Sequence, residues 1–163
     1  MITGNFRFKS FKFPCGEPHV TVLDFPGNFD VVWDYDGKNE ELIELLLLCD
    51  AIKRAEGELN ELFIPYIPFG RQDRVANFGE AFSLKVFTAI INGLGFKRVT
   101  TLDPHSDVTT SLIDNICPVH QEGIFGEELS KARNFWLVSP DGGALKKVYK
   151  LARAFPDHLL GVI

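Results

Sequence analysis

Several features that mark special classes of protein are scarce in this sequence. It has only three cysteines among 163 residues (Cys15, Cys49 and Cys117), and they show neither zinc-type spacing nor an accompanying secretory signal. That pattern disfavours a disulfide scaffold and favours the reducing cytoplasm. The unbroken apolar stretch Leu45–Cys49 is far too short to cross a bilayer, so no membrane partner is expected.

A surplus of positive charge is also missing. The 17 Lys and Arg residues are outnumbered by 22 Asp and Glu residues, so the formal net charge is −5 and the sequence pI is about 5.3. Nucleic-acid backbones and anionic membranes attract basic proteins, so neither is an expected partner. Any phosphate group that the chain binds must therefore be held by a few local side chains.

The overall composition is that of a folded domain. Hydrophobic residues make up 45% and charged residues 24%, which excludes a disordered or low-complexity chain. A chain of 163 residues buries roughly two-thirds of its unfolded surface. We therefore expect residues 1–163 to form one compact domain.

Alternation of aromatic and basic residues predicts β-structure at the start of the chain. Phenylalanines at positions 6, 8, 11 and 13 are interleaved with basic residues, and turn residues follow at Pro14–Pro18. Further short strands are predicted at Val20–Leu23 and Phe29–Trp33. We expect these segments to form a small antiparallel sheet or ribbon.

The pattern changes to a helical one at Asn39. This residue can cap a helix, Glu40 and Glu41 suit the positive helix start, and Leu42–Ala55 is apolar over most of its circumference. A helix of that kind is expected to lie between a sheet and another element.

Strands and helices alternate in the rest of the chain. The predicted strands are Leu62–Ile67, Arg98–Asp103, Cys117–His120, Phe135–Ser139 and Leu159–Ile163. The predicted helical segments are Gly79–Leu94, Val108–Ile113, Glu127–Ala132 and Ala144–Ala154. Such alternation predicts an α/β fold, with a mainly parallel sheet, helices on both of its faces, and an N-terminal antiparallel strand pair.

Polar segments follow three of the predicted parallel strands, where open α/β sheets bind ligands. The segment Phe69–Arg74 carries two guanidinium groups and an amide, which suit a polyphosphate, although a solvated turn with an Arg–Asp pair explains it equally well. The segment Asp103–Asp107 offers two carboxylates and an imidazole for a cation or a phosphate. Its alternative is an ordinary loop in which Asp107 caps the next helix.

The third segment is Ser139–Gly143, at the start of a predicted helix. Its glycines let a ligand approach the backbone, and Asp141 can face a cation, but a plain strand-to-helix turn needs the same residue types. Three such segments on successive strand ends predict a single shared crevice. No P-loop, GxGxxG fingerprint, nucleophile elbow or Ser/His/Asp triad is found, which disfavours the corresponding enzyme classes.

These segments, in this order, resemble those of the ribose-phosphate pyrophosphokinases, also called phosphoribosyl pyrophosphate synthetases. The helix Glu44–Ala55 is similar to the first long helix of the family, and Ile64–Arg74 to its strand and ATP-contacting loop. Asp103–His105 resembles an Asp-Leu-His segment, Val138–Gly143 a Ser-Pro-Asp turn, and Phe13–Glu17 an adenine-binding hairpin. The resemblance therefore spans most of the chain.

The resemblance implies Mg²⁺-dependent transfer of diphosphate from ATP to ribose 5-phosphate, giving phosphoribosyl pyrophosphate and AMP. The residues it implies in ATP binding are Phe13, Glu17, Arg71, Gln72, Asp73, Arg74 and His105. His105 is also the implied catalytic residue, and His105 with Asp141 would position the magnesium ion. In the family the hairpin serves a neighbouring subunit, which implies a homo-oligomer.

The chain also departs from the family pattern. Cys15 stands where a carboxylate or amide usually contacts adenine, Pro104 replaces a leucine, and Ala144 replaces a glycine. The family's catalytic Lys/Arg loop and its acidic ribose-phosphate loop, which follow a strand like Leu159–Ile163, are absent from these 163 residues. We interpret the chain as an amino-terminal ATP-binding half that lacks the carboxy-terminal domain and is inactive alone.

Two other interpretations stay open at this point. A related pyrophosphokinase can use ADP-ribose as the acceptor, in nicotinamide nucleotide synthesis, and the residues that would discriminate lie outside this sequence. Alternatively, the chain is a non-catalytic regulatory or binding subunit that assembles with the enzyme through its Phe-rich N-terminal sheet.

Overall fold

The computed structural model describes residues 1–132, 135–155 and 158–162. It divides the chain into two compact units, Met1–Pro118 and Val119–Ile163. The buried hydrophobic residues of the described chain likewise form two clusters, one in each unit, where the sequence predicted one domain. Each unit is therefore described by itself.

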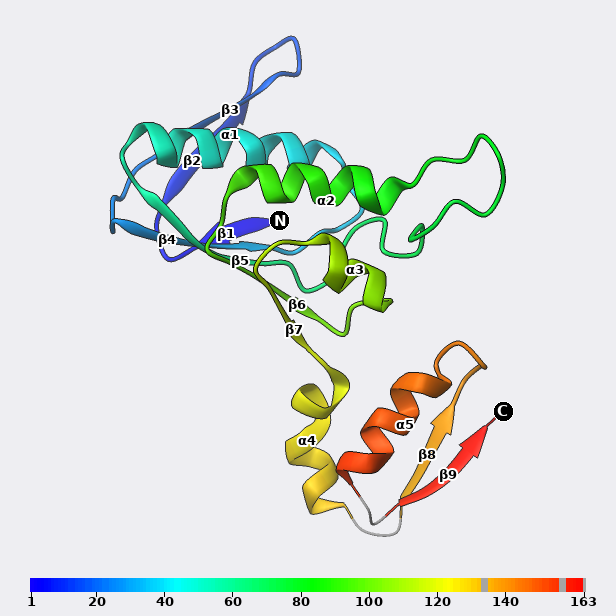
Figure 1. The fold of residues 1–163 in the computed structure, drawn as a ribbon. Coiled ribbons are helices and arrows are strands. Elements are labelled where there is room, and N and C mark those ends of the chain that lie inside the picture. Colours follow the sequence, from blue (N-terminus) through cyan, green and yellow to red (C-terminus); the bar gives the residue numbers. More distant parts are fainter. Residues whose placement is uncertain (133–134, 156–157, 163) are drawn as a thin grey trace. The chain divides into compact units, whose positions relative to one another are not determined.

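A five-stranded sheet forms the centre of the first unit (Figure 1). Its strands, in spatial order, are β1 (Ile2–Gly4), β4 (Asn28–Trp33), β5 (Glu58–Phe63), β6 (Arg98–Leu102) and β7 (Ile116–Val119). β1 runs antiparallel to β4, whereas β4 with β5 and β5 with β6 pair in parallel. The predicted α/β class with a mainly parallel sheet is confirmed.

Three helices connect the parallel strands: α1 (Glu40–Arg54), α2 (Ser83–Leu94) and α3 (Asp107–Leu112). α1 and α2 lie side by side over one face of the sheet, where the sequence predicted helices on both faces (Figure 1). The reason is topological, because right-handed crossovers that step from β4 to β5 to β6 in one direction leave their helices on the same side. Burial follows this arrangement: Phe29, Val31 and Trp33 of β4 are buried, and the alternate residues are half-buried or exposed.

A separate antiparallel pair, β2 (Phe8–Lys12) and β3 (Pro18–Val22), matches the predicted N-terminal hairpin. Val20 and Val22 are buried, and β3 packs against α1. α1 therefore lies between the hairpin and the sheet, as its apolar circumference predicts. The expected grouping of Phe29–Trp33 with this hairpin is wrong, because that strand is β4 of the main sheet.

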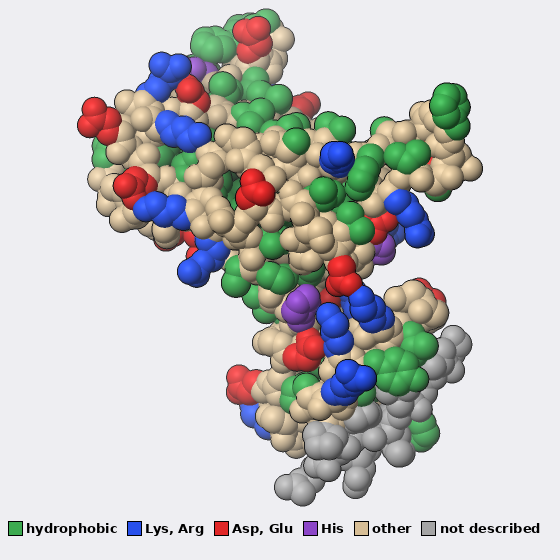
Figure 2. All heavy atoms as spheres, viewed as in Figure 1, with side chains coloured by type: hydrophobic (Ala, Val, Ile, Leu, Met, Phe, Trp, Pro, Cys, Tyr) green, Lys and Arg blue, Asp and Glu red, His purple; other side chains and the backbone are tan. Residues whose placement is uncertain are grey.

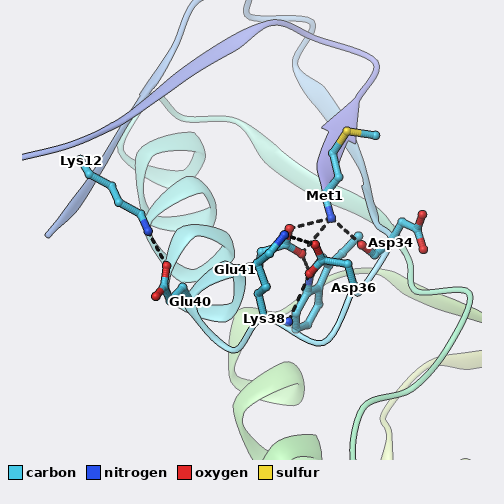
Figure 3. A network of polar contacts seen from close by, with 8 residues as sticks. Met1, Lys12, Asp34, Asp36, Lys38, Glu40 and Glu41 are labelled. Carbon is cyan, nitrogen blue, oxygen red and sulfur yellow. Dashed lines mark hydrogen bonds and ion pairs between the residues drawn. The ribbon is translucent and has the colours of Figure 1, made fainter. Parts of the chain in front are cut away.

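Polar contacts hold the start of α1 to the sheet (Figure 3). The Glu41 carboxylate accepts hydrogen bonds from the Trp33 indole at 2.9 Å and from the Met1 amine at 2.8 Å. Lys12 of the hairpin forms an ion pair with Glu40. Asn39 precedes the helix as predicted, but its side chain makes no capping bond and instead accepts a hydrogen bond from the Tyr35 hydroxyl at 2.9 Å.

Some observed boundaries differ from the predicted ones. β5 begins four residues earlier than expected and ends at Phe63, because Pro65 and Pro68 lack the amide hydrogen that a strand needs. α2 begins at Ser83 instead of Gly79, since residues 76–80 form a separate turn. α4 (Gln121–Lys131) is a full helix where only the turn Glu127–Ala132 was expected.

The second unit contains α4, β8 (Phe135–Ser139), α5 (Leu145–Ala154) and β9 (His158–Val162). β8 and β9 pair in parallel, and the predicted β8 boundaries are confirmed. The described core of this unit consists of Leu137, Val148, Leu151 and Ala152. Residue Ile163 of the last predicted strand lies outside the described residues. None of the helices described in either unit combines the length and apolarity that spanning a membrane requires.

Candidate functional site

Two of the three candidate loops meet at one edge of the main sheet. The loop after β5 stays on the end of β6, where the Leu102 amide donates to the Pro65 carbonyl at 3.2 Å. Further along, a Cβ atom placed on Gly70 would lie 3.6 Å from the His105 Cβ atom. The backbone next to Arg71 therefore packs directly against His105, as expected for the carboxyl ends of adjacent parallel strands.

The turn before Arg71 has an unusual backbone. Phe69, not the glycine that follows it, adopts a positive φ of 62°. Such a conformation is strained for a bulky residue, and the Phe69 ring is held by packing on Phe87 with ring centroids 5.8 Å apart. Gly70 is buried and its space is limited, with the Ile67 carbonyl oxygen 3.1 Å from where a Cβ would be. The sequence signals a turn here, but it does not reveal this strained phenylalanine.

The side chains of this loop are available to a ligand. Arg71, Gln72 and Arg74 are exposed, and Asp73 is half-buried. Neither guanidinium group takes part in an ion pair with another described residue. The backbone beneath them is fixed, because the Gln72 carbonyl accepts a hydrogen bond from the Leu84 amide of α2 at 3.2 Å. Two cationic groups on a fixed backbone suit an anionic ligand.

The loop after β6, which packs against Gly70, carries an imidazole. His105 is exposed, Pro104 is buried, and Asp103 adopts a positive φ of 38°. The Ser106 hydroxyl is buried and has no hydrogen-bond partner among the described residues. Asp107 is the first residue of α3, so the expected cap position belongs to Ser106.

The hairpin residues occupy a different part of the first unit. Phe13 is 44% exposed, and its ring packs edge-on against Phe11 with centroids 4.9 Å apart. His19 lies against both rings; Phe11 and His19 are cross-strand partners, but the sequence pattern alone did not predict this contact. Glu17 is exposed, and its carboxylate accepts a 3.4 Å hydrogen bond from the Cys15 thiol. The hairpin tip is separated from the loops after β5 and β6 in Figure 1.

Asp141 lies in the second unit, where it has a structural role. Its Oδ1 atom accepts a hydrogen bond from the Ala144 amide at 2.8 Å, which satisfies an amide at the start of α5. The buried Ser139 hydroxyl donates to the Asp141 carbonyl at 2.7 Å. A Cβ on Gly143 would lie 3.2 Å from the carboxylate, so glycine suits this turn. The expected convergence of Asp141 with Arg71 and His105 stays a prediction.

The positions of the His, Cys, Asp and Glu side chains show whether the described residues could hold a metal ion on their own. Within the described residues, no three or more His, Cys, Asp or Glu side chains are grouped so that they could hold a metal ion. Mg²⁺ commonly takes only one or two protein side chains and completes its shell with water and substrate phosphates. A site of that kind does not require three protein side chains.

The family model and the curated proteins that match this chain carry the same enzyme name. Residues 30–95 match the family model described as the N-terminal domain of ribose phosphate pyrophosphokinase. Among curated proteins, the chain is 33% identical over 146 residues to a ribose-phosphate pyrophosphokinase of Pyrococcus abyssi, covering 86% of this chain and 50% of that one. It is 36% identical over 122 residues to the enzyme of the same name from Bacillus subtilis, covering 72% and 38% of the two chains.

A solved structure shares the fold. The chain aligns with phosphoribosylpyrophosphate synthetase from Mycobacterium smegmatis with a TM-score of 0.80 and 22% sequence identity, over 97% of this chain and 55% of that one. The sequence thus spans about half the length, or less, of the curated relatives described above.

Proposed function

Because the chain belongs to the ribose-phosphate pyrophosphokinase family, we propose that it is the ATP-binding half of an enzyme that transfers diphosphate from ATP to ribose 5-phosphate. The reaction requires Mg²⁺ and yields phosphoribosyl pyrophosphate and AMP. The chain corresponds to about half of its relatives, and the resemblance assigns the ribose-phosphate loop to their other half. Catalysis is therefore proposed for the complete protein, and nucleotide binding for these 163 residues.

One observation carries the proposal: Gly70 packs against His105, which brings the Arg71 loop and the His105 loop together. Arg71 and Arg74 would bind the phosphates of ATP through charge-assisted hydrogen bonds, with Gln72 and Asp73 fixing its orientation. Positive charge at this place would stabilise the negative charge that accumulates as AMP departs. His105 is the proposed catalytic residue, since it is exposed and its Cβ atom lies against Gly70, the residue before Arg71.

His105 and Asp141 are the protein groups proposed to hold Mg²⁺. Bound there, the ion would neutralise the polyphosphate and align it for attack. Asp141 is compatible with this role, because one described hydrogen bond uses its Oδ1 atom and a carboxylate has further acceptor sites.

The hairpin is the proposed base-binding element. Phe13 would stack on adenine, and Glu17 would hydrogen-bond its edge. Since the hairpin tip and the Arg71 loop lie apart in one copy (Figure 1), the hairpin would act on the nucleotide of a neighbouring copy, which requires a homo-oligomer.

The proposal is tested by titrating the chain with MgATP while recording its amide NMR spectrum. We expect shifts in residues 70–74 and 103–107, and an affinity at least about tenfold lower in the Arg71→Ala variant, since one charge-assisted bidentate contact contributes about 1.5–3 kcal/mol. Arg54→Ala is the matched control, because Arg54 is an exposed arginine on α1 that pairs only with Asp50 in the described structure. Equal ATP affinity in the Arg71→Ala variant and the unmodified chain would count against the assignment.

A further inference from the structure

His19 lies on the outer face of the β2–β3 hairpin, and the proposed function gives it no role. Its cross-strand partner is Phe11. Residues alternate between the two faces of a strand, and Val20 and Val22 are buried where β3 packs on α1, so His19 belongs to the opposite face. Figure 2 shows hydrophobic side chains and a histidine together on the hairpin, at the top of the view. This face of the hairpin is open to a ligand.

Three aromatic rings contact one another on this outer face. The centroid of the His19 imidazole lies 5.2 Å from that of Phe11 and 5.9 Å from that of Phe13, with interplanar angles of 56° and 58°. The Phe11 and Phe13 rings have centroids 4.9 Å apart and cross at 70°. All three separations lie within the range that aromatic pairs prefer, and the tilted arrangements avoid repulsion between ring faces. The Phe13 ring is therefore held by contacts with both other rings.

The backbone that carries Phe13 is fixed as well. The Phe13 amide donates a hydrogen bond to the Glu17 carbonyl at 2.9 Å, and the Gly16 amide donates one to the Phe13 carbonyl at 2.8 Å. Gly16 closes this turn with a positive φ of 93°, which glycine adopts without strain. The freedom that remains at Phe13 is rotation of its side chain, and the two neighbouring rings restrict that rotation.

The ring contacts are the main interactions of the His19 side chain. The side chain is exposed, so it is not part of the hydrophobic core. Within the described parts of the chain it forms no hydrogen bond or ion pair, and it belongs to no group of three or more side chains that could hold a metal ion. An effect of removing this imidazole should therefore be transmitted through Phe11 and Phe13.

We propose that His19 is a positioning residue for base binding: together with Phe11, it holds the ring of Phe13 in the orientation that stacks on a purine. This inference rests on the proposed function, which assigns the adenine base to Phe13. The Phe13 side chain is still 44% exposed, so surface is left for the base. A ring that is already held loses less rotational freedom when a base stacks on it, so more of the stacking free energy appears as affinity.

The first test compares the affinities of the full chain for MgATP and for magnesium tripolyphosphate, which lacks the base. We expect His19→Ala to raise the Kd of ATP at least about threefold and to leave that of tripolyphosphate unchanged, because only the base stacks. His19→Phe keeps a ring at this position and should retain the original ATP affinity. Thr21→Ala is the matched control, since Thr21 is exposed two residues further along the same face of β3, and it should change neither affinity.

A double-mutant cycle separates support of Phe13 from direct contact between His19 and the nucleotide. We expect Phe13→Ala to raise the Kd of ATP about tenfold, and the addition of His19→Ala to raise it no further. A further threefold rise in the double variant overturns the inference, and so does a His19→Phe variant as weak as His19→Ala. Loss of the amide NMR pattern of the hairpin in His19→Ala also overturns it, because the role of His19 would then be to fold the hairpin.

Failure of this inference is distinguishable from failure of the proposed function. If Phe13→Ala leaves the Kd of ATP unchanged, or if the chain binds neither ATP nor tripolyphosphate, the proposed base contact is wrong and this inference is wrong with it. If Phe13→Ala weakens ATP binding whereas His19→Ala does not, the inference alone is wrong.

Discussion

At the scale of single residues, Cys49 shows how burial sets chemical behaviour. The side chain, on α1, is 1% exposed, and this burial raises the pKa of its thiol to about 12, with Lys53 opposing the shift to a smaller extent. Cys15 and Cys117 are exposed. Only the thiolate attacks disulfide reagents, so the three cysteines should react at very different rates.

We expect a disulfide reagent at pH 8 to label Cys15 and Cys117 promptly in the folded chain and to label Cys49 only after unfolding. The pKa shift also has a consequence for stability. An unfolded Cys49 releases its proton at a lower pH than the folded one, so the free energy of unfolding should fall as pH rises from about 9 towards 12. Reagent titration with and without denaturant counts the thiols, and rapid labelling of three in the native chain would contradict the expectation.

At the scale of elements, Gly57 permits close packing against α1 and β4 where the chain passes from α1 to β5. It lies between them, and a Cβ atom at this position would be 2.4 Å from a ring carbon of Phe29 and 2.9 Å from a methyl carbon of Ile52. Both neighbours are fully buried and have no space in which to move. A glycine is therefore required by packing at this junction.

Gly57→Ala is expected to lower the free energy of unfolding by about 1–3 kcal/mol, as overpacking does in other cores. Gly93→Ala is the matched control, because Gly93 lies within α2 and a Cβ there meets nothing within 4 Å. The control should gain about 0.5–1 kcal/mol, since alanine is the better helix former. Urea denaturation measures both, and a Gly57→Ala variant as stable as the original would show that the junction can widen.

Periodicity predicts most of these elements, because core-facing residues repeat with the helix or strand period. β8 has the predicted boundaries, and β6, α3 and α5 lie within a residue or so of them. The predicted start of β5 was too late in the sequence, because the first residues of this strand are polar and pair across strands. Asn60 donates a hydrogen bond to Asp30 at 2.6 Å, and Glu61 accepts one from Thr100. Hydrogen bonds between residues so distant along the chain leave no trace in a local pattern.

The candidate site likewise has features that the sequence predicts and features that it does not. The meeting of the Arg71 and His105 loops follows from the order of parallel strands and was predictable. Three other features were not predictable, because each depends on tertiary contacts. They are the left-handed backbone of Phe69, the turn held by Glu80, and the aromatic group of Phe11, Phe13 and His19.

At the scale of the whole molecule, the two units differ in size, with 118 residues in Met1–Pro118 and 45 in Val119–Ile163. The first contains 22 buried hydrophobic residues, including the fully buried Phe29, Trp33 and Leu45, whereas the second contains four in its described part. The stability of a unit grows with the apolar surface that it buries, and units of about 45 residues are marginal on this ground. The chain should therefore not unfold as a single cooperative body.

We expect amide hydrogens of α5 and β8 to exchange faster than those of α1 and β5 when the full chain is placed in deuterated water at neutral pH. Local opening of a small core needs less free energy than opening of a large one, so the difference should be at least about a hundredfold in protection factor, or 2.7 kcal/mol. Hydrogen-exchange mass spectrometry measures this on peptides from each helix. α4 serves as an internal comparison, because none of its described residues is buried. Its amide hydrogens should exchange faster than those of α1 and α5. Equal protection in α1 and α5 would mean that the second unit draws stability from more than the four residues of its described core.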